Sequence, residues 1–297
     1  MELNDLIKSN CYHICTNGQE APLLMKDDED YKVACVYLAL VAWKLNVDVF
    51  AYIVMSNHVH FLVACKNRKE AEVFLKAYKQ KLALYFMHKY GIRKPLRGIS
   101  DSITLVDSLH YFRNCVAYIL RNALCAKVCK RLEDYPWSSY SAYFADSKKL
   151  NLRRLDSYTG REIRKLIRSN DDVAGCPICV CDDGRIADRS FVRFDIVEKV
   201  FKNSNRSFIY TLGICNDAQM EYEFAYKPQI RVGDMEMLSV AEQLASSRFS
   251  GKCLSDLSSA DKCKMIKALY FNNKTSVPQL SRILGLSREL VANVLSY

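Results

Sequence analysis

One segment near the N-terminus, residues 47–64, limits the fold of this chain more than any other part of the sequence. Residues 47–55 and 58–64 are both rich in β-branched and aromatic side chains, and only Ser56 and Asn57 separate them. Two such runs with a tight connection pair as antiparallel neighbours. The sequence therefore predicts a β-hairpin, around which the other elements of the first half of the chain have to be arranged.

The segments around this hairpin predict a regular order of strands and helices. An acidic first turn at residues 27–30 precedes apolar residues at helical spacing, and a second helical pattern stops at Gly91. The predicted strands are residues 10–16 and 102–106, and the predicted helices are residues 31–45, 69–90 and 108–130. The order β-α-β-β-α-β-α is the split βαβ plan. For residues 1–145 we predict an α+β domain of the ferredoxin-like or RRM-like kind, an antiparallel sheet with helices on one face.

The last fifty residues predict a small all-α unit. Helical patterns cover residues 260–271, 277–284 and 288–295, and Gly285 lies in the second connection, which is the spacing of a helix-turn-helix. In such a unit Ser287 caps the recognition helix, and the residues expected to face the major groove are Arg288, Glu289 and Asn293. A three-helix packing module without DNA contacts fits the same pattern.

The middle of the chain shows no regular pattern. Residues 146–250 contain a basic stretch, a loop rich in Cys and Asp, and scattered aromatic residues, and we assign them no fold. The expected organisation is a catalytic domain at 1–145, a basic connecting region at 146–250 and a DNA-binding helix-turn-helix domain at 251–297.

Charge and composition favour a polyanionic partner and a reducing compartment. The formal net charge is +10, and the chain has 18 Tyr and 13 Phe, so basic side chains and stacking surfaces are both abundant. The 13 cysteines are scattered and odd in number, which favours free thiols in the cytoplasm, here in association with the nucleoid. The longest apolar run, residues 33–43, is shorter than the roughly 20 residues of a spanning helix, so no membrane segment is expected.

Two histidines in the predicted hairpin are candidates for metal binding. His58 and His60 are two positions apart on a predicted strand, so both imidazoles project from one side of the sheet and can converge on a divalent ion. The intervening Val59 then points to the opposite side, into the core. A His-x-His pair alone also occurs without any metal.

The helix predicted at residues 108–130 carries the second half of this constellation. Tyr118 and Asn122 are four residues apart and share a helical face, so a nucleophile and a third metal ligand can lie together. A bound metal polarises a phosphoryl oxygen, and a tyrosine hydroxyl can attack phosphorus to give a covalent phosphotyrosine. By periodicity alone, Tyr118 fits core packing and Asn122 fits a hydrogen bond to a neighbouring loop equally well.

Several motifs together resemble the single-tyrosine HUH transposases, specifically the REP-associated tyrosine transposases and related insertion-sequence transposases. The matching stretches are Tyr12-His13-Ile14, residues 27–31, residues 55–63 around His58-Val59-His60, residues 118–122 and residues 135–140. They occur in the family's order and cover about the first 145 residues. The family usually has a proline after the asparagine, whereas this chain has Ala123, so its helix is expected to continue past Asn122.

The resemblance implies a function and a set of site residues. It implies that His58, His60 and Asn122 hold Mg²⁺ or Mn²⁺, and that Tyr118 is the nucleophile. It further implies a DNA-nicking and strand-transferring enzyme that acts on single-stranded or hairpin DNA through a 5′-phosphotyrosine, and it leaves a homodimer open. The alternatives are a domesticated sequence-specific DNA-binding protein without cleavage activity and, less well matched, a rolling-circle replication initiator.

Basic residues predict where DNA lies. Between residues 66 and 97 there are ten Lys or Arg against two acidic residues, and Arg113 and Arg121 share a helix with Tyr118. The predicted DNA contacts in these two stretches are Lys76, Lys79, Arg113 and Arg121. Separately, Cys176, Cys179 and Cys181 have part of a zinc-knuckle spacing, and reduced thiols in a surface loop are the alternative.

Overall fold

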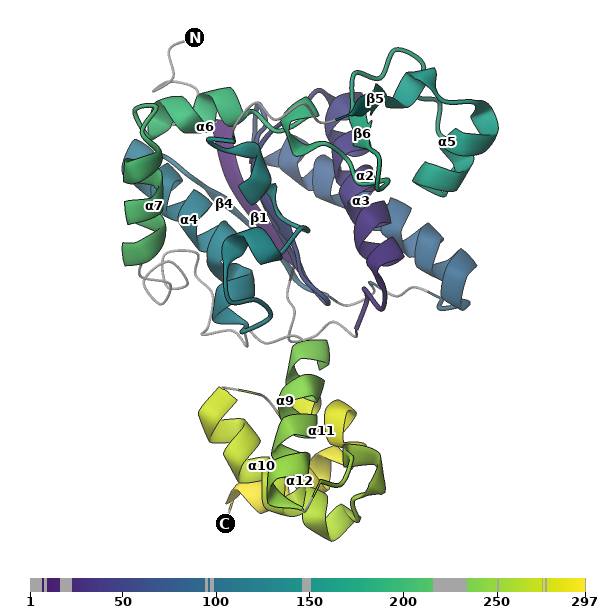
Figure 1. Cartoon of the computed structure of the whole chain (residues 1–297), viewed down its shortest axis with the longest axis vertical. Helices are drawn as coiled ribbons and strands as arrows, with labels where there is room; N and C mark the ends of the chain where they lie inside the picture. Colours follow the sequence, from purple (N-terminus) through teal and green to yellow (C-terminus); the bar gives the residue numbers. More distant parts are fainter. Residues whose placement is uncertain are drawn as a thin grey trace.

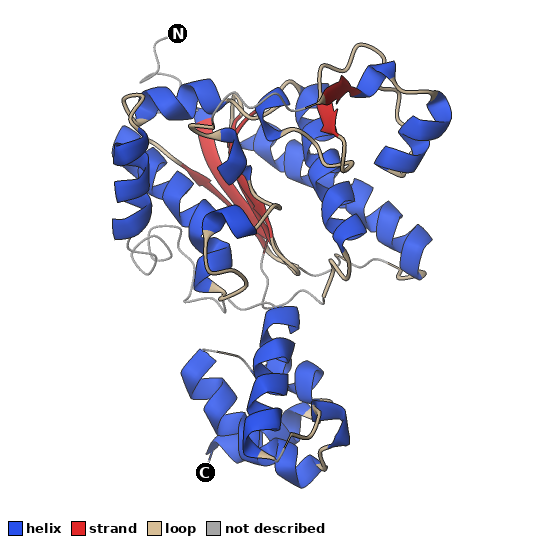
Figure 2. Ribbon diagram, in the orientation of Figure 1, coloured by secondary structure: helices blue, strands red, loops and turns tan. Residues whose placement is uncertain are grey.

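The structure is a computed structural model that describes residues 7, 10–16, 23–93, 96, 99–145, 151–215, 234–249, 251–273, 275 and 277–296. A four-stranded antiparallel sheet lies at its centre, built from β1 (Cys11–Thr16), β2 (Asp48–Val54), β3 (Val59–Ala64) and β4 (Asp101–Leu105). The strand order is β2-β3-β1-β4, so β3 of the hairpin lies between β1 and β2. The sheet is drawn in red among the helices in Figure 2. This order is that of the split βαβ plan, and the predicted α+β class and antiparallel sheet are confirmed.

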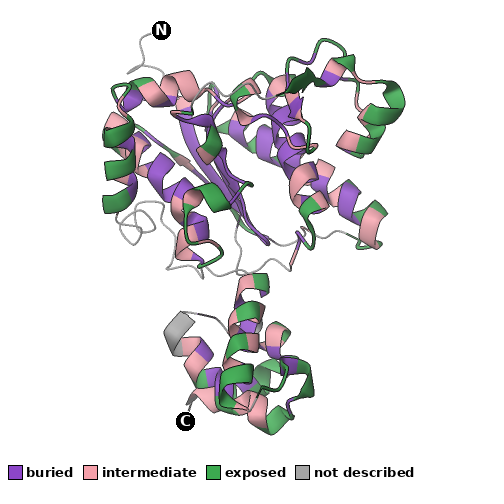
Figure 3. Ribbon diagram, viewed as in Figure 1, coloured by how far each residue is buried: buried purple, intermediate pink, exposed green. Residues whose placement is uncertain are grey.

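Helices cover both faces of this sheet. On one face, Phe61 of β3 contacts Phe74 and Tyr78 of α3 (Arg68–Tyr90), and α2 (Asp28–Leu45) packs beside α3. On the other face, His60 contacts Tyr118 of α4 (Leu109–Cys125). The expectation of helices on one face therefore holds for α2 and α3, whereas α4 lies on the opposite face and covers the two histidines. Strands β1, β2 and β3 are buried almost throughout, whereas only Ile103 of β4 is buried (Figure 3).

Each of these helices begins at a polar side chain that caps its free backbone N–H groups. The caps are Asp27 for α2, Asn67 for α3 and Ser108 for α4. Helix α4 ends at Cys125, five residues before the predicted end, because Lys127 is left-handed at φ 58° and the Val128 N–H donates to the Ala123 carbonyl. The prediction that Ala123 lets the helix continue past Asn122 is confirmed.

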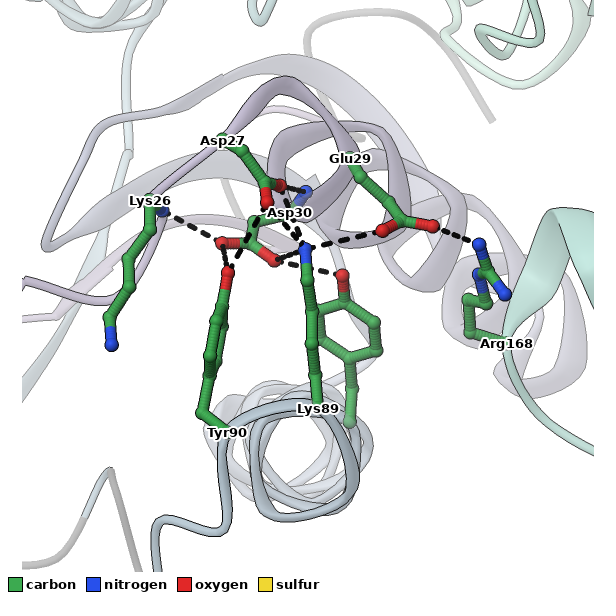
Figure 4. A network of polar contacts seen from close by, with 8 residues as sticks. Lys26, Asp27, Glu29, Asp30, Lys89, Tyr90 and Arg168 are labelled. Carbon is green, nitrogen blue, oxygen red and sulfur yellow. Dashed lines mark hydrogen bonds and ion pairs between the residues drawn. The ribbon is translucent and has the colours of Figure 1, made fainter.

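A buried carboxylate joins α2 to α3. The fully buried Asp30, in the first turn of α2, accepts hydrogen bonds from the hydroxyls of Tyr85 and Tyr90 at 2.8 Å and from Lys89 Nζ at 2.7 Å (Figure 4). The neighbouring Glu29 pairs with Arg168. The acidic first turn, which the sequence assigns to the helix dipole, therefore also ties the start of α2 to the last turn of α3.

Residues 151–215 add short elements to the same hydrophobic core. These are β5 (Leu152–Arg154), α5 (Gly160–Ile167), β6 (Cys179–Cys181), α6 (Phe194–Val200) and α7 (Asn205–Ile214), with 3₁₀ turns at Leu155–Ser157 and Asp188–Ser190. Strands β5 and β6 pair as a separate two-stranded sheet. Side chains such as Leu155, Val197 and Phe208 are buried with those of the four-stranded sheet, so this core extends beyond residue 145.

The predicted motif at residues 135–140 lies along the outer edge of β2. The Val54 N–H donates to the Trp137 carbonyl at 2.9 Å, and the Tyr52 N–H donates to Ser139 Oγ at 3.0 Å. The motif is flanked by 3₁₀ turns at Leu132–Asp134 and Ser139–Ala142. It therefore satisfies backbone groups of β2 on the side that faces away from β3.

The C-terminal helices form a second core. Helix α9 (Asp234–Arg248) packs with α10 (Ser259–Asn273), α11 (Val277–Leu284) and α12 (Arg288–Ser296), and a 3₁₀ turn lies at Leu254–Asp256. Gly285, at φ 65°, makes the turn between α11 and α12, and Ser287 Oγ accepts from the Leu290 N–H, as predicted for the cap. We call α9–α12 the helical unit; Figure 1 shows it at the lower end of the molecule. Among the described residues, no helix is long and apolar enough to cross a membrane.

Candidate functional site

Strand β3 and the turn before it bring the two predicted ligands together. His60 lies on β3, and His58 lies just before it, where its carbonyl accepts from the Met55 N–H at 2.8 Å. Their ring centroids are 5.2 Å apart and the rings are nearly perpendicular. The side chains of His58 and His60 are only 5% and 4% exposed, so both are held in one orientation by their surroundings.

A hydrogen bond from Asn57 sets the tautomer of His58. Asn57 Oδ1 lies 2.8 Å from His58 Nδ1, and an amide oxygen can only accept, so Nδ1 donates this hydrogen bond. Burial lowers the pKa of His58 to about 4, although its hydrogen bond with the Asn122 side chain opposes this shift. The imidazole is therefore neutral at pH 7, the form in which histidine binds metals.

His13 of β1 supports the second ligand. His13 Nε2 lies 3.1 Å from His60 Nδ1, and the two rings are stacked with an interplanar angle of 3°. Burial lowers the pKa of His13 to about 3, so this side chain is neutral too. A partner on Nδ1 fixes the ring of a metal-binding histidine and leaves Nε2 to face the ion.

Helix α4 places Tyr118 and Asn122 against these histidines. The Tyr118 ring lies edge-on to both neighbours, at 5.5 Å from the His60 centroid and 6.0 Å from the His13 centroid. Asn122 is 4% exposed, and its Nδ2 donates to the Tyr118 carbonyl at 3.0 Å. The side chains of His58, His60, Tyr118 and Asn122, which come from two elements, therefore meet at one buried place.

His, Cys, Asp and Glu side chains make up only part of this arrangement. No group of three or more His, Cys, Asp or Glu side chains that could hold a metal occurs in the described ranges. A set of His58, His60 and Asn122 contains only two residues of those types. Cys176, Cys179 and Cys181 lie within these ranges, Cys176 is buried, and no disulfide links any of the 13 cysteines.

The predicted DNA-contacting residues lie in three places. Lys76 and Lys79 line a cleft of about 600 Å³ between α3 and β4, where Lys79 pairs with Asp101 at 2.8 Å. Arg113 Nε donates to the Val200 carbonyl and Arg121 donates to the Leu212 carbonyl, at or near the last turns of α6 and α7. Arg288 and Asn293 are exposed on α12. The basic side chains of α4 therefore also hold neighbouring helices in place.

Sequence reasoning did not identify two of the residues that orient the histidines. His13 appears in the sequence only as part of a matched motif, and Asn57 only as part of the tight connection between the two strands. His13, His58 and His60 have one signal in common, because all three alternate onto the same sheet face once β1 pairs with β3. That pairing register is not visible in the sequence.

Comparisons with known proteins find one partial structural similarity. No protein-family model matches this chain, and no curated protein matches it. The solved structure "Structure of the REP associates tyrosine transposase bound to a REP hairpin" is similar to it with a TM-score of 0.33 and 17% sequence identity. The similarity covers 45% of this chain and 78% of that chain.

Proposed function

We propose that this protein is a transposase-type enzyme that nicks and joins single-stranded or hairpin DNA through a covalent bond to Tyr118. The observation that carries the proposal is the meeting of Tyr118 with His58 and His60, with the His60 and Tyr118 ring centroids 5.5 Å apart. A tyrosine beside two histidines is a potential nucleophile beside two potential metal ligands. The motif resemblance described above supports the same assignment.

The donor set fits a divalent metal. His58 and His60 would supply imidazole nitrogens and Asn122 an amide oxygen, and the low pKa of His58 keeps its nitrogen unprotonated. Imidazole nitrogens suit Mn²⁺ better than Mg²⁺, which prefers oxygen ligands, so we expect Mn²⁺ to be the more effective ion. When bound, the ion would supply Lewis-acid polarisation of the scissile phosphate.

The chain's own residues account for the bond changes. The Tyr118 hydroxyl loses its proton and its oxygen attacks phosphorus, which forms a Tyr–O–P bond and breaks the bond from phosphorus to the 3′ oxygen. The 3′ oxygen takes up a proton and leaves as a free hydroxyl. Attack of a 3′ hydroxyl on the phosphotyrosine reverses these changes and rejoins DNA, so the energy of the phosphodiester bond is conserved.

A second candidate function is sequence-specific DNA binding without cleavage. Tyr118 is only 8% exposed, and Asn122 makes an ordinary hydrogen bond within the helix, which are also features of well-packed side chains. In this reading Arg288 and Asn293 would carry the DNA contacts, and the buried histidines would only stabilise the sheet.

Covalent capture of DNA tests the proposal. Labelled single-stranded hairpin DNA from beside the gene is incubated with the protein and Mn²⁺, and a protein–DNA adduct is sought on denaturing gels. Wild type is expected to form an alkali-stable adduct, while Tyr118→Phe and His58→Ala form none. Tyr111→Phe is the matched control, since it removes a hydroxyl from the same helix seven positions earlier.

The outcomes separate the two candidate functions. An adduct that persists in Tyr118→Phe would show that another residue is the nucleophile. Binding of the hairpin without any adduct, in Mn²⁺ or Mg²⁺, would favour the DNA-binding protein.

A further inference from the structure

The turn that carries the candidate site is held at Ser56. Ser56 is fully buried and directly precedes Asn57 and His58. Its carbonyl accepts hydrogen bonds from the N–H groups of Leu24 and Met25, at 3.0 and 2.9 Å. The Ser56 hydroxyl is a further polar group of this turn, and its partner also helps to fix the turn.

That partner comes from the helical unit. Ser56 Oγ donates to Glu236 Oε2 at 2.9 Å, across 180 residues of sequence. Desolvation raises the pKa of Glu236, and the hydrogen bond from Ser56 opposes the rise. The carboxylate also lies near the hydroxyls of Tyr31 and Tyr135: burial is the main cause of their raised pKa values, and the charge of Glu236 adds to it.

The residues around the Glu236 carboxylate belong to the sheet domain. Tyr135 donates to the Val54 carbonyl at 2.7 Å, in the last residue of β2, and Tyr31 stacks on Trp137 with ring centroids 5.2 Å apart. Glu236 therefore lies among residues that are themselves fixed to the β2–β3 hairpin. The contact that α9 makes with the sheet domain through the Glu236 carboxylate is therefore specific.

Glu236 is equally well fixed on the side of the helical unit. Two residues earlier, Asp234 accepts both hydrogen bonds of Arg282, with Nε–Oδ2 at 2.7 Å and Nη2–Oδ1 at 3.0 Å. Arg282 belongs to α11, and Asp234 is 9% exposed. A two-point arginine–carboxylate pair of this kind holds its partners in a defined geometry. It therefore anchors the first turn of α9, which carries Glu236, to the helix-turn-helix.

We infer that Glu236 is a positioning residue of the candidate site, which fixes Ser56 and, through it, the turn that presents Asn57 and His58. The helical unit is then a structural part of the site as well as a second contact with DNA. This inference rests on the proposed function for its catalytic readout but not for its structural one. Groups that orient a metal ligand from behind change metal affinity or activity by roughly ten- to a hundredfold when removed.

Three variants of the full chain test this role. Glu236→Ala removes the acceptor, Glu236→Gln keeps an oxygen that can accept from Ser56, and Glu242→Ala is the matched control. Glu242 lies on the same helix but accepts from the Leu254 N–H inside the helical unit. The readouts are the Mn²⁺ concentration for half-maximal nicking, the KM for hairpin DNA, and hydrogen exchange at the amides of Leu24 and Met25.

We expect Glu236→Ala to raise the half-maximal Mn²⁺ concentration about tenfold, with little change in KM, and to speed exchange at Leu24 and Met25. Glu236→Gln and Glu242→Ala should both behave as wild type. If Glu236→Ala matches Glu242→Ala in metal dependence and in exchange, the positioning role is wrong. If wild type does not nick DNA, the proposed function fails, and the exchange data alone decide the role of Glu236.

Discussion

His13 shows how much one side chain behind the site can contribute. It is 1% exposed, and its Nε2 lies 3.1 Å from His60 Nδ1, so it contacts the ligand directly. The predicted role of His60 as a metal ligand does not by itself require His13 as a partner. The contact arises because β1 and β3 pair in a register that puts Cys15 opposite His60.

We predict that His13→Phe weakens Mn²⁺ binding roughly tenfold or more, because the His60 ring loses the partner that fixes its orientation. Phenylalanine fills a similar volume, so the fold should be retained. Isothermal titration with Mn²⁺ measures the effect, and Tyr12→Phe, on the opposite face of β1, is the control. Unchanged affinity in His13→Phe would mean that His60 is oriented by its packing alone.

For single residues, the sequence predicts the candidate nucleophile and metal ligands better than it predicts the contacts that hold them in place. His58, His60, Tyr118 and Asn122 are found from spacing and motif, and the structure brings all four together. Whether they bind metal and cut DNA stays a prediction. The supporting contacts of His13 and Ser56 could not be foreseen, because they depend on strand register and on a helix far away in sequence. The Asn57 contact is local, but it depends on the geometry of the turn.

Ion pairs help to hold the short elements of residues 151–215 against the sheet domain, in addition to the hydrophobic core that they share with it. Asp171 follows α5 and pairs with Lys44 of α2, at 2.5 Å, and with Lys81 of α3. Burial opposes ionisation of Asp171, but the two ammonium groups outweigh it, so its pKa is lowered. A lowered carboxyl pKa stabilises the fold above the unfolded value, near 3.8, and this stabilisation is lost as the pH falls towards the folded value.

Asp171→Asn should therefore lower the free energy of unfolding by about 2 kcal/mol at pH 7, the range for hydrogen bonds to charged groups. The difference from wild type should shrink below pH ~4, where the carboxyl of the unfolded chain takes up a proton while that of the folded chain stays ionised. Urea unfolding at several pH values measures this dependence. Asp172→Asn removes the same charge from an exposed neighbour and should have little effect; a pH-independent loss in Asp171→Asn would contradict the ion-pair explanation.

Long, strongly patterned elements could be predicted and short ones could not. The predicted strands and the helices α2, α3, α11 and α12 agree with the structure to within a few residues. Strand β5 has three residues, all exposed, and carries no hydrophobic period. Helix α9 has buried Met237, Ala241 and Ala245 at helical spacing, but alanine contributes little to a hydrophobic pattern.

The whole molecule has two hydrophobic cores, one around the sheet and one inside the helical unit. Both tryptophans of the chain, Trp43 and Trp137, pack with the first core. Tryptophan fluorescence therefore reports on the sheet domain, while far-UV circular dichroism reports on both.

Leu269, fully buried in α10, allows the two cores to be separated. We predict that Leu269→Ala lowers the stability of the helical unit by about 2–5 kcal/mol and leaves the fluorescence transition of the sheet domain in place. Chemical unfolding followed by both signals is the measurement, and Lys267→Ala, exposed on the same helix, is the control. A fluorescence transition that moves together with the circular dichroism would mean that the two cores unfold as one unit.

The outer edge of β4 determines how far the sheet can extend. Strand β4 is the last in the order β2-β3-β1-β4, and an edge strand presents free carbonyl groups to any chain that meets it. Arg68 of α3 donates to the Ile103 carbonyl at 3.0 Å, and Lys79 binds Asp101 at the start of the strand. A strand from a second molecule would have to displace both cations before it could pair. Two basic side chains thus protect the open edge from aggregation, although neither contributes to the core.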